Sequence, residues 1–197
     1  MLVSWPTLTE EIEHCQKCRL CAGRTHPVPG EGSPHARLMF IGEGPGRDED
    51  LSGRPFVGRA GQLLDKMIAA IGLSREEVYI ANVVKCRPPQ NRAPEADETA
   101  ACMPYLRAQV GLIRPQVIVL LGSSALGAIL GPEHRITRER GAWIERKGVW
   151  FMPTFHPAAL LRDESKKRPV WEDLKKVRDK LRELEANEPN HADKPDA

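Results

Sequence analysis

Three short apolar segments, each followed by glycine or polar residues, restrict the possible folds more than any other part of the sequence. They span residues 37–42, 78–84 and 116–121. Runs of this length and composition are typical of strands that are buried on both faces. Residues 60–71 and 95–113, which lie between these segments, have the pattern of helices. Strands that alternate with helices predict a central, mainly parallel sheet covered on both faces.

The rest of the chain predicts shorter elements around this sheet. Residues 8–14 form an amphipathic segment, residues 141–155 suggest a hairpin or two short strands, and a last helix covers residues 169–184. A chain of 197 residues is long enough for one packed domain and short for two. We therefore expect a single domain over residues 1–184 and a polar, disordered tail over residues 185–197.

Composition excludes several classes of protein. A net charge of +2 excludes a uniformly basic, histone-like chain but allows a local basic face. The sequence has no apolar run of the roughly 18 residues that a membrane span needs, and its start lacks the pattern of a secretory signal. We therefore expect an intracellular protein, in which the five cysteines would not form disulfides.

Four of the cysteines could form one metal site. Cys15 and Cys18 make a C-x-x-C pair near the N-terminus, and Cys86 and Cys102 follow far downstream. Four thiolates suffice for a tetrahedral zinc ion or for a [4Fe–4S] cluster, and the spacing does not distinguish the two. Cys21 could replace Cys18 as a ligand. In the alternative interpretation, Cys86 and Cys102 are small buried apolar residues.

Two loops that follow predicted strands contain residues suited to binding or catalysis, because ligands of parallel sheets bind beyond the carboxyl ends of the strands. Residues 42–46 contain three glycines but lack the Gly-Lys-Ser/Thr ending of a phosphate-binding loop. They predict either a planar heterocycle read by main-chain N–H groups or a tight turn. In residues 155–162, His156 could donate a hydrogen bond to a developing anion, and the leucine pair could enter a base stack. The alternative is a structural His-Pro helix start.

Taken together, these residues resemble the family 4 uracil-DNA glycosylases, the iron–sulfur branch of the uracil-DNA glycosylase superfamily. The matching stretches occur in the family's order, over about residues 10–182. They are residues 15–20, 42–46, 53–64, 82–89, 121–122 and 156–162. The resemblance implies an α/β/α sandwich with a four-stranded parallel sheet. It also implies a [4Fe–4S] cluster whose ligands map onto Cys15, Cys18, Cys86 and Cys102.

The implied reaction is hydrolysis of the bond between uracil and deoxyribose, which leaves an abasic site. Uracil has to leave the duplex to be reached. It would stack on Phe56 while Asn82 reads O4 and N3–H and His156 bonds O2. The backbone around Glu43 and Gly44, with Gly42, would hold the other side of the ring. Taken singly, Phe56 would be a core residue and Asn82 a turn former.

The resemblance leaves the activation of water open. The best-known branch of the superfamily has an aspartate at the position of Gly44, where this chain has no side chain. We expect Glu43 to position the water, with Glu49 as the second choice and as a substrate contact; Glu49 is otherwise part of a solvated acidic face. Leu160 would fill the gap that the base leaves, with Arg162 near a phosphate.

The predicted partner is uracil-containing DNA, single- or double-stranded, bound by a monomer in the cytoplasm of a prokaryote and associated with its nucleoid. Arg87, Arg92 and Arg162 follow strand ends and would neutralise phosphates at the rim. A second hypothesis is a protein that traps uracil-DNA through a histidine in a basic insertion, but residues 87–94 contain no histidine. A third is a cluster- or zinc-bearing module that binds DNA without chemistry, which gives Asn82 and His156 no role.

Overall fold

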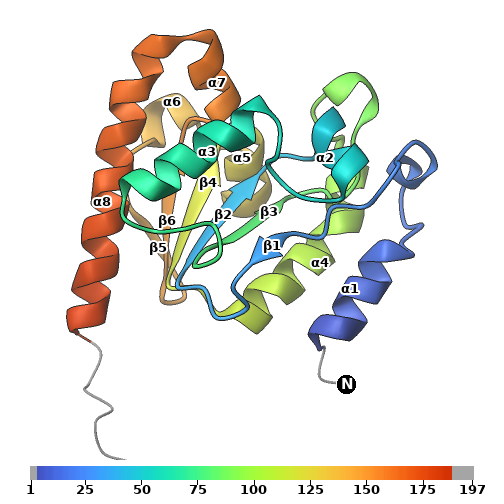
Figure 1. Cartoon of the computed structure of the whole chain (residues 1–197), viewed down its shortest axis with the longest axis horizontal. Coiled ribbons are helices and arrows are strands. Elements are labelled where there is room, and N and C mark those ends of the chain that lie inside the picture. The colour runs from blue at the N-terminus through green and yellow to red at the C-terminus, as the bar shows by residue number, and fades with distance from the viewer. Residues whose placement is uncertain (1–3, 188–197) are drawn as a thin grey trace, which may run out of the picture.

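The computed structural model describes residues 4–187, and their strands form one sheet in the order β1-β3-β2-β4-β6-β5 (Figure 1). The four inner strands are parallel, and β1 and β5 add to the two edges in antiparallel orientation. The strands are β1 (Glu31–Gly32), β2 (Leu38–Gly42), β3 (Tyr79–Asn82), β4 (Val117–Leu121), β5 (Ile144–Arg146) and β6 (Val149–Thr154).

The predicted α/β class with a mainly parallel sheet is confirmed. The two edge strands are additions to the four parallel strands that the family resemblance implies. Strand β1 has two residues, too few for any hydrophobic periodicity to reveal it. Strand β5 and strand β6 are the two short strands expected within residues 141–155.

Helices cover both faces of the sheet. Figure 1 shows α8 along one side of the molecule and α1 beside α4 on the other. The helices are α1 (Trp5–Glu13), η1 (Arg19–Ala22), α2 (Arg47–Ser52), α3 (Arg59–Ala70), η2 (Pro89–Asn91), α4 (Ala96–Ile113), α5 (Ser123–Leu130), α6 (Ile136–Glu139), α7 (Pro157–Arg162), η3 (Glu164–Lys166) and α8 (Lys167–Ala186).

Alternation along the strands divides the core into two layers. Met39 and Ile41 of β2 belong to a buried cluster with α1, α4 and α5. Leu38 and Phe40 belong to a second cluster with α3, α7 and α8. Successive side chains of a strand point to opposite faces, so a strand that is apolar throughout is buried on both faces. This is why the short apolar runs predicted the sandwich.

The C-terminal helix is longer than predicted. Helix α8 ends at Ala186, so residues 185 and 186, which were expected in a disordered tail, are helical. Residues 188–197 of that tail lie outside the described residues. None of the helices in the described part of the chain is long and apolar enough to cross a membrane.

The strand order places a crevice beside β2. From β2 the chain continues to β3 on one side, then passes through α4 to β4 on the other side of β2. The loops after these strands therefore separate at their carboxyl ends, which is where open α/β sheets bind ligands.

Candidate active site and cysteine site

A pocket of about 560 Å³ lies at this crevice, and residues at or just beyond the carboxyl ends of the four parallel strands form its wall. The loop after β2 supplies Glu43, and β3 supplies Asn82. The first turn of α5, after β4, supplies Ser124, and the segment after β6 supplies His156. Of the nine residues predicted to bind substrate or act in catalysis, seven line the pocket. They are Glu43, Gly44, Glu49, Phe56, Asn82, His156 and Arg162.

Asn82 lines the pocket and has a buried acceptor without a partner. Its side chain is 2% exposed, and its Oδ1 is the buried side-chain atom of the described residues that has no hydrogen-bond partner. Native structures pair nearly all buried polar atoms, so an orphaned acceptor indicates a missing donor. Gly42 acts here through its lack of a side chain, because a Cβ would lie 2.5 Å from Asn82 Oδ1 and 2.5 Å from Phe56 Cζ.

Phe56 has a left-handed backbone conformation, with φ at +52°, which is uncommon for a bulky residue. Arg75 stabilises this turn by donating to the carbonyl oxygens of Pro55 and Phe56, the latter at 3.2 Å. Gly61 lets the turn pack against α3, since a Cβ there would lie 1.8 Å from the Phe56 oxygen. The aromatic ring faces His156, with ring centroids 5.5 Å apart.

Glu49 holds two loops together. One carboxylate oxygen accepts hydrogen bonds from the N–H groups of Val57 and Gly58, both at 2.9 Å, and the other accepts one from Gly46 at 3.0 Å. These three bonds join the loop after β2 to the turn that carries Phe56. The predicted substrate contact of Glu49 has no direct support in this arrangement, although the side chain lines the pocket.

His156 is a neutral hydrogen-bond donor. Its Nδ1 accepts from the N–H of Ala158 at 3.1 Å, so the ring proton lies on Nε2. Burial, reinforced by the charge of Arg162 and opposed by Glu49, lowers the pKa of His156 from 6.5 to about 4. The ring therefore stays uncharged at neutral pH.

Glu43 is the carboxylate nearest to the end of β2. It accepts a hydrogen bond from the hydroxyl of Ser124, at the start of α5. Next to it, Gly44 leaves room for the loop after β3, because a Cβ there would lie 2.8 Å from Val84 Cγ2. The carboxylate is thus oriented from the β4 side and borders the pocket.

Leu160, which is predicted to enter the base stack, is buried in the structure, and its neighbour Leu161 is exposed. Leu160 is 2% exposed and packs in the core cluster beneath α3 and α8, whereas Leu161 is 40% exposed. A side chain that penetrates a base stack has to project from the surface, so Leu161 is the candidate. Neither Leu160 nor Gly42 lines the pocket.

All five cysteines line a second, small cavity between the N-terminal segment, the loop after β3 and α4. Three of their sulfurs accept N–H donors. The N–H of Lys17 donates to Cys15 at 3.5 Å, the Arg24 guanidinium to Cys86 at 3.2 Å, and the N–H of Lys85 to Cys102 at 3.2 Å. Residues far apart in sequence therefore meet, as the four-thiolate interpretation predicted.

Comparison with known proteins settles the family. A sequence model of the Uracil DNA glycosylase superfamily matches residues 29–175. The chain belongs to the uracil-DNA glycosylase superfamily. It is 48% identical to a type-4 uracil-DNA glycosylase of Sulfurisphaera tokodaii, over 87% of this chain and 82% of that protein. It is also 48% identical to a type-4 uracil-DNA glycosylase of Thermotoga maritima, over 87% of this chain and 91% of that protein. These matches confirm the predicted resemblance.

Type-5 uracil-DNA glycosylases are more distant relatives within the superfamily. The chain is 34% identical to the type-5 enzyme of Pyrobaculum aerophilum, over 68% of this chain and 66% of that protein. Five type-4 enzymes match at 41–48% identity. The chain is thus nearer to these type-4 members than to that type-5 member of the superfamily.

The donor set of the cysteine site suits a metal group bound by thiolates. Four cysteine thiolates can hold a tetrahedral zinc ion or a [4Fe–4S] cluster. Within residues 4–187, no three His, Cys, Asp or Glu side chains converge closely enough to hold a single metal ion. The N–H donors and the cations around the sulfurs suit thiolates.

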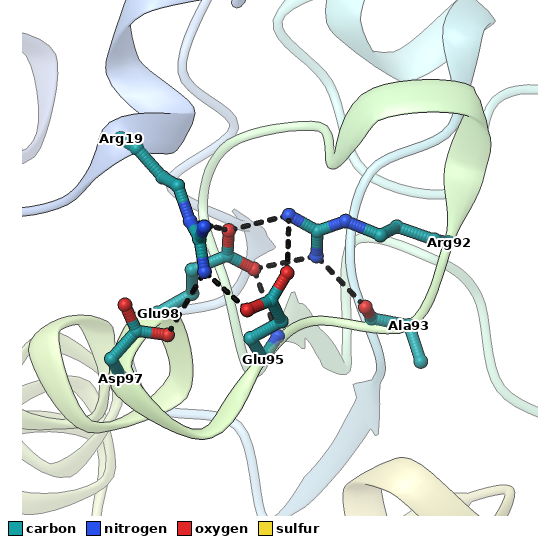
Figure 2. Close-up of polar contacts among 6 residues, drawn as sticks. All are labelled: Arg19, Arg92, Ala93, Glu95, Asp97 and Glu98. Atoms are coloured by element: carbon teal, nitrogen blue, oxygen red, sulfur yellow. Dashed lines mark hydrogen bonds and ion pairs between the residues drawn. The ribbon is translucent and has the colours of Figure 1, made fainter.

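A buried carboxylate joins the cysteine segment to the loop after β3 (Figure 2). Glu98, with a fully buried side chain, accepts from Arg19 Nε at 3.0 Å and from both terminal nitrogens of Arg92 at 2.8 and 2.6 Å. These bonds hold the pKa of Glu98 well below its usual range, and the bond from Arg92 has the largest effect. Arg92, predicted to contact a phosphate, lines the pocket and is also bound to Glu98. Arg19 also contacts Glu95 and Asp97.

Sequence reasoning missed four residues that the structure places around the two sites: Arg75, Lys85, Glu98 and Ser124. Each acts through a partner at least three residues away in sequence, and for Ser124 and Glu43 the separation is 81 residues. A serine after a strand-ending glycine is typical of a helix start. Only the fold shows which carboxylate it meets.

Proposed function

We propose that the chain removes uracil from DNA by hydrolysing its N-glycosidic bond, as its family membership indicates, and that the pocket beside β2 is the active site. The orphaned, buried Oδ1 of Asn82 is the observation that supports this location best. A pyrimidine with a protonated N3 supplies the donor that this atom lacks.

Base recognition starts with a nucleotide turned out of the helix, because the glycosidic bond is inaccessible inside the stack. The ring of Phe56 supports one face of the base. In the orientation of the structure, Asn82 Oδ1 accepts from N3–H of uracil while its amide nitrogen donates to O4. Cytosine has an acceptor at N3 and a donor at C4, so both contacts would fail.

His156 stabilises the leaving group. As the bond to deoxyribose breaks, negative charge collects on the uracil ring, including O2. The neutral Nε2–H of His156 donates to that oxygen without the proton transfer that an imidazolium would favour. A preorganised donor of this kind contributes roughly 3–4 kcal/mol to transition-state stabilisation.

Glu43 positions the attacking water. The Ser124 hydroxyl fixes the rotamer of its carboxylate at the pocket wall. Because the departure of uracil leaves an oxocarbenium-like sugar, a weakly activated water suffices. Glu43 accepts the proton of that water as the new C–O bond forms.

A [4Fe–4S] cluster would be held by Cys15, Cys18, Cys86 and Cys102, with Cys21 outside the ligand set. Bound there, the cluster supplies structural stabilisation, because metal-binding free energy becomes folding free energy. The protein's own contribution is to tie its N-terminal segment to the loop after β3 and to α4.

DNA binds across the mouth of the pocket. Arg162 lines it, and Arg87 lies in the loop after β3. Leu161, next to Arg162 in the sequence, is exposed and takes the place of the extruded base. The proposed partner is single- or double-stranded uracil-containing DNA, bound by a monomer associated with a prokaryotic nucleoid.

Incubation with uracil-containing single- and double-stranded oligonucleotides, followed by alkaline cleavage, tests the function. We expect strand cleavage at uracil, and none with cytosine at the same position. Asn82→Ala should be inactive under the same conditions. An SDS-stable shifted band would instead indicate a trapping protein. Binding without cleavage would indicate a DNA-binding module, and either result would overturn the proposal.

A further inference from the structure

Lys85 is a buried cation between the two sites. Its side chain is 2% exposed, and it immediately precedes Cys86. The ammonium donates hydrogen bonds to the main-chain oxygen of Asn82 at 2.9 Å and to Gln109 Oε1 at 2.7 Å. Both acceptors are neutral, so neither compensates its charge.

A buried ammonium that lacks a counter-charge is strongly destabilising. Lys85 lines the cavity of the five cysteines, and its main-chain N–H donates to the sulfur of Cys102 at 3.2 Å. Arg24 donates to the sulfur of Cys86. Four cysteine thiolates with an iron–sulfur core carry a net negative charge, which is the charge that two buried or half-buried cations would balance.

The other end of this arrangement is the residue that reads the base. Strand β1 pairs with β3 only as far as Ile80, so the carbonyl of Asn82 lies beyond the covered part of the strand edge. Lys85 supplies the donor that a neighbouring strand would otherwise supply. Gln109 holds the ammonium from behind, because its own amide donates to Pro29 O at 2.8 Å and to Tyr79 Oη at 3.1 Å.

We propose that Lys85 is a positioning residue with two roles: its charge balances the cysteine-bound cluster, and its hydrogen bond fixes the main chain from which Asn82 reads uracil. The second role rests on the proposed function. Retention of the cluster and accuracy of base reading would then depend on one ammonium group. Charge and hydrogen bonding can be separated by substitution.

Three variants of the cluster-loaded protein test this. Lys85→Met removes both the charge and the hydrogen bond, whereas Lys85→Gln removes the charge and keeps a donor amide. Lys66→Met, on the exposed side of α3, is the matched control. The first measurement is the rate at which a chelator and an oxidant bleach the visible absorption of the cluster. The second is the excision rate at saturating uracil-DNA, and the KM is measured separately under steady-state conditions.

We expect both Lys85 variants to bleach at least about tenfold faster than the wild type. Excision at saturation should fall about 10- to 100-fold in Lys85→Met with little change in KM, because a displacement of about 1 Å in a site has effects of this size. Lys85→Gln should recover most of that loss. The control should match the wild type in both assays.

If both variants bleach at the wild-type rate, the counter-charge role is wrong. If Lys85→Met does not fold, the bleaching rate of Lys85→Gln is sufficient to test this role. Equal excision by Lys85→Gln and Lys85→Met would overturn the positioning role. A wild-type protein that leaves uracil-DNA intact would refute the proposed function instead, and the bleaching comparison would still decide the counter-charge role.

Discussion

The hydroxyl of Ser124 donates a hydrogen bond to the carboxylate of Glu43, and so the first turn of α5 orients the proposed water-positioning base at the end of β2.

We expect Glu43→Gln to lower the excision rate by about 10²- to 10⁴-fold, the usual contribution of a general base. Ser124→Ala should lower kcat by about tenfold and leave KM unchanged. Kinetic measurements give both rates, with Ser74→Ala, an exposed serine outside the pocket, as the control. Equal, near-wild-type rates would place the base elsewhere.

Asn82→Asp should abolish the recognition of uracil. The change replaces the amide donor by an acceptor in a side chain that is 2% exposed, so O4 of uracil would face a carboxylate. A site built on such pairing discriminates by about 10⁴-fold or more, and we expect a loss of at least about 100-fold on uracil with some gain on cytosine. Excision from matched oligonucleotides measures both. A near-wild-type rate on uracil would mean that the base binds in another place.

Acid should inactivate the enzyme only well below the ordinary pKa of histidine. The pKa of His156 is lowered from 6.5 to about 4 by burial first, then by Arg162. The neutral donor therefore persists down to about pH 4, and kcat/KM should show no loss near pH 6.5 that depends on this residue. A pH–rate profile of the free enzyme measures this, and an inflection near 6.5 that disappears in His156→Asn would contradict it.

The same group makes stability depend on pH. Between pH 6.5 and 4, His156 is protonated in the unfolded chain but neutral in the folded protein. Acidification through this range should therefore lower the free energy of unfolding. Urea denaturation at several pH values, compared with His156→Asn, measures the contribution. A variant with an unchanged pH dependence would show that His156 is not the cause.

The neighbouring leucines should respond differently to substitution. Leu161→Ala removes an exposed side chain, so we expect unchanged stability and about tenfold slower excision from double-stranded DNA, with single-stranded DNA unaffected. Leu160→Ala empties a core position and should cost about 2–5 kcal/mol of unfolding free energy. Denaturation midpoints and rates on the two substrates separate them. An Leu161→Ala variant with wild-type activity on duplexes would remove the wedge role.

Arg75 should prove more important than its exposed neighbour Arg54. Both bind Glu31, but Arg75 also holds the carbonyls of the turn that carries Phe56, and its side chain is 13% exposed against 61% for Arg54. Arg75→Ala leaves those carbonyls without a donor, at about 1–3 kcal/mol for each buried group. It should raise KM as well as lower stability. Arg54→Ala should do neither, as denaturation and steady-state kinetics can show.

The residues that sequence reasoning located best are those that end strands. Asn82 and the loop after β2 follow apolar runs whose length marks them as buried, and parallel strands bring their carboxyl ends to one edge. His156 follows β6 in the same way. Position in the sheet therefore sufficed to predict that these side chains meet.

Other features depend on information that a local pattern lacks. Whether Leu160 or Leu161 is buried depends on how the six-residue helix α7 is rotated on α3, and so short a helix shows no clear periodicity. The bond from Lys85 to Asn82 spans three residues, but it requires a turn after β3 that brings the lysine back over the strand edge. The ion pair between Arg19 and Glu98 joins residues that are 79 positions apart in the sequence.

Because the walls of the pocket come from four loops spread over residues 43–162, no contiguous part of the chain can form it alone. Contacts of such long sequence separation form late, after the loop-closure entropy of the whole parallel sheet has been overcome. A nascent or truncated chain that ends before α7 would have cysteines and a glycine-rich loop but no complete pocket. Uracil affinity should therefore appear in a single step with the native sheet, and it would report on complete folding during synthesis.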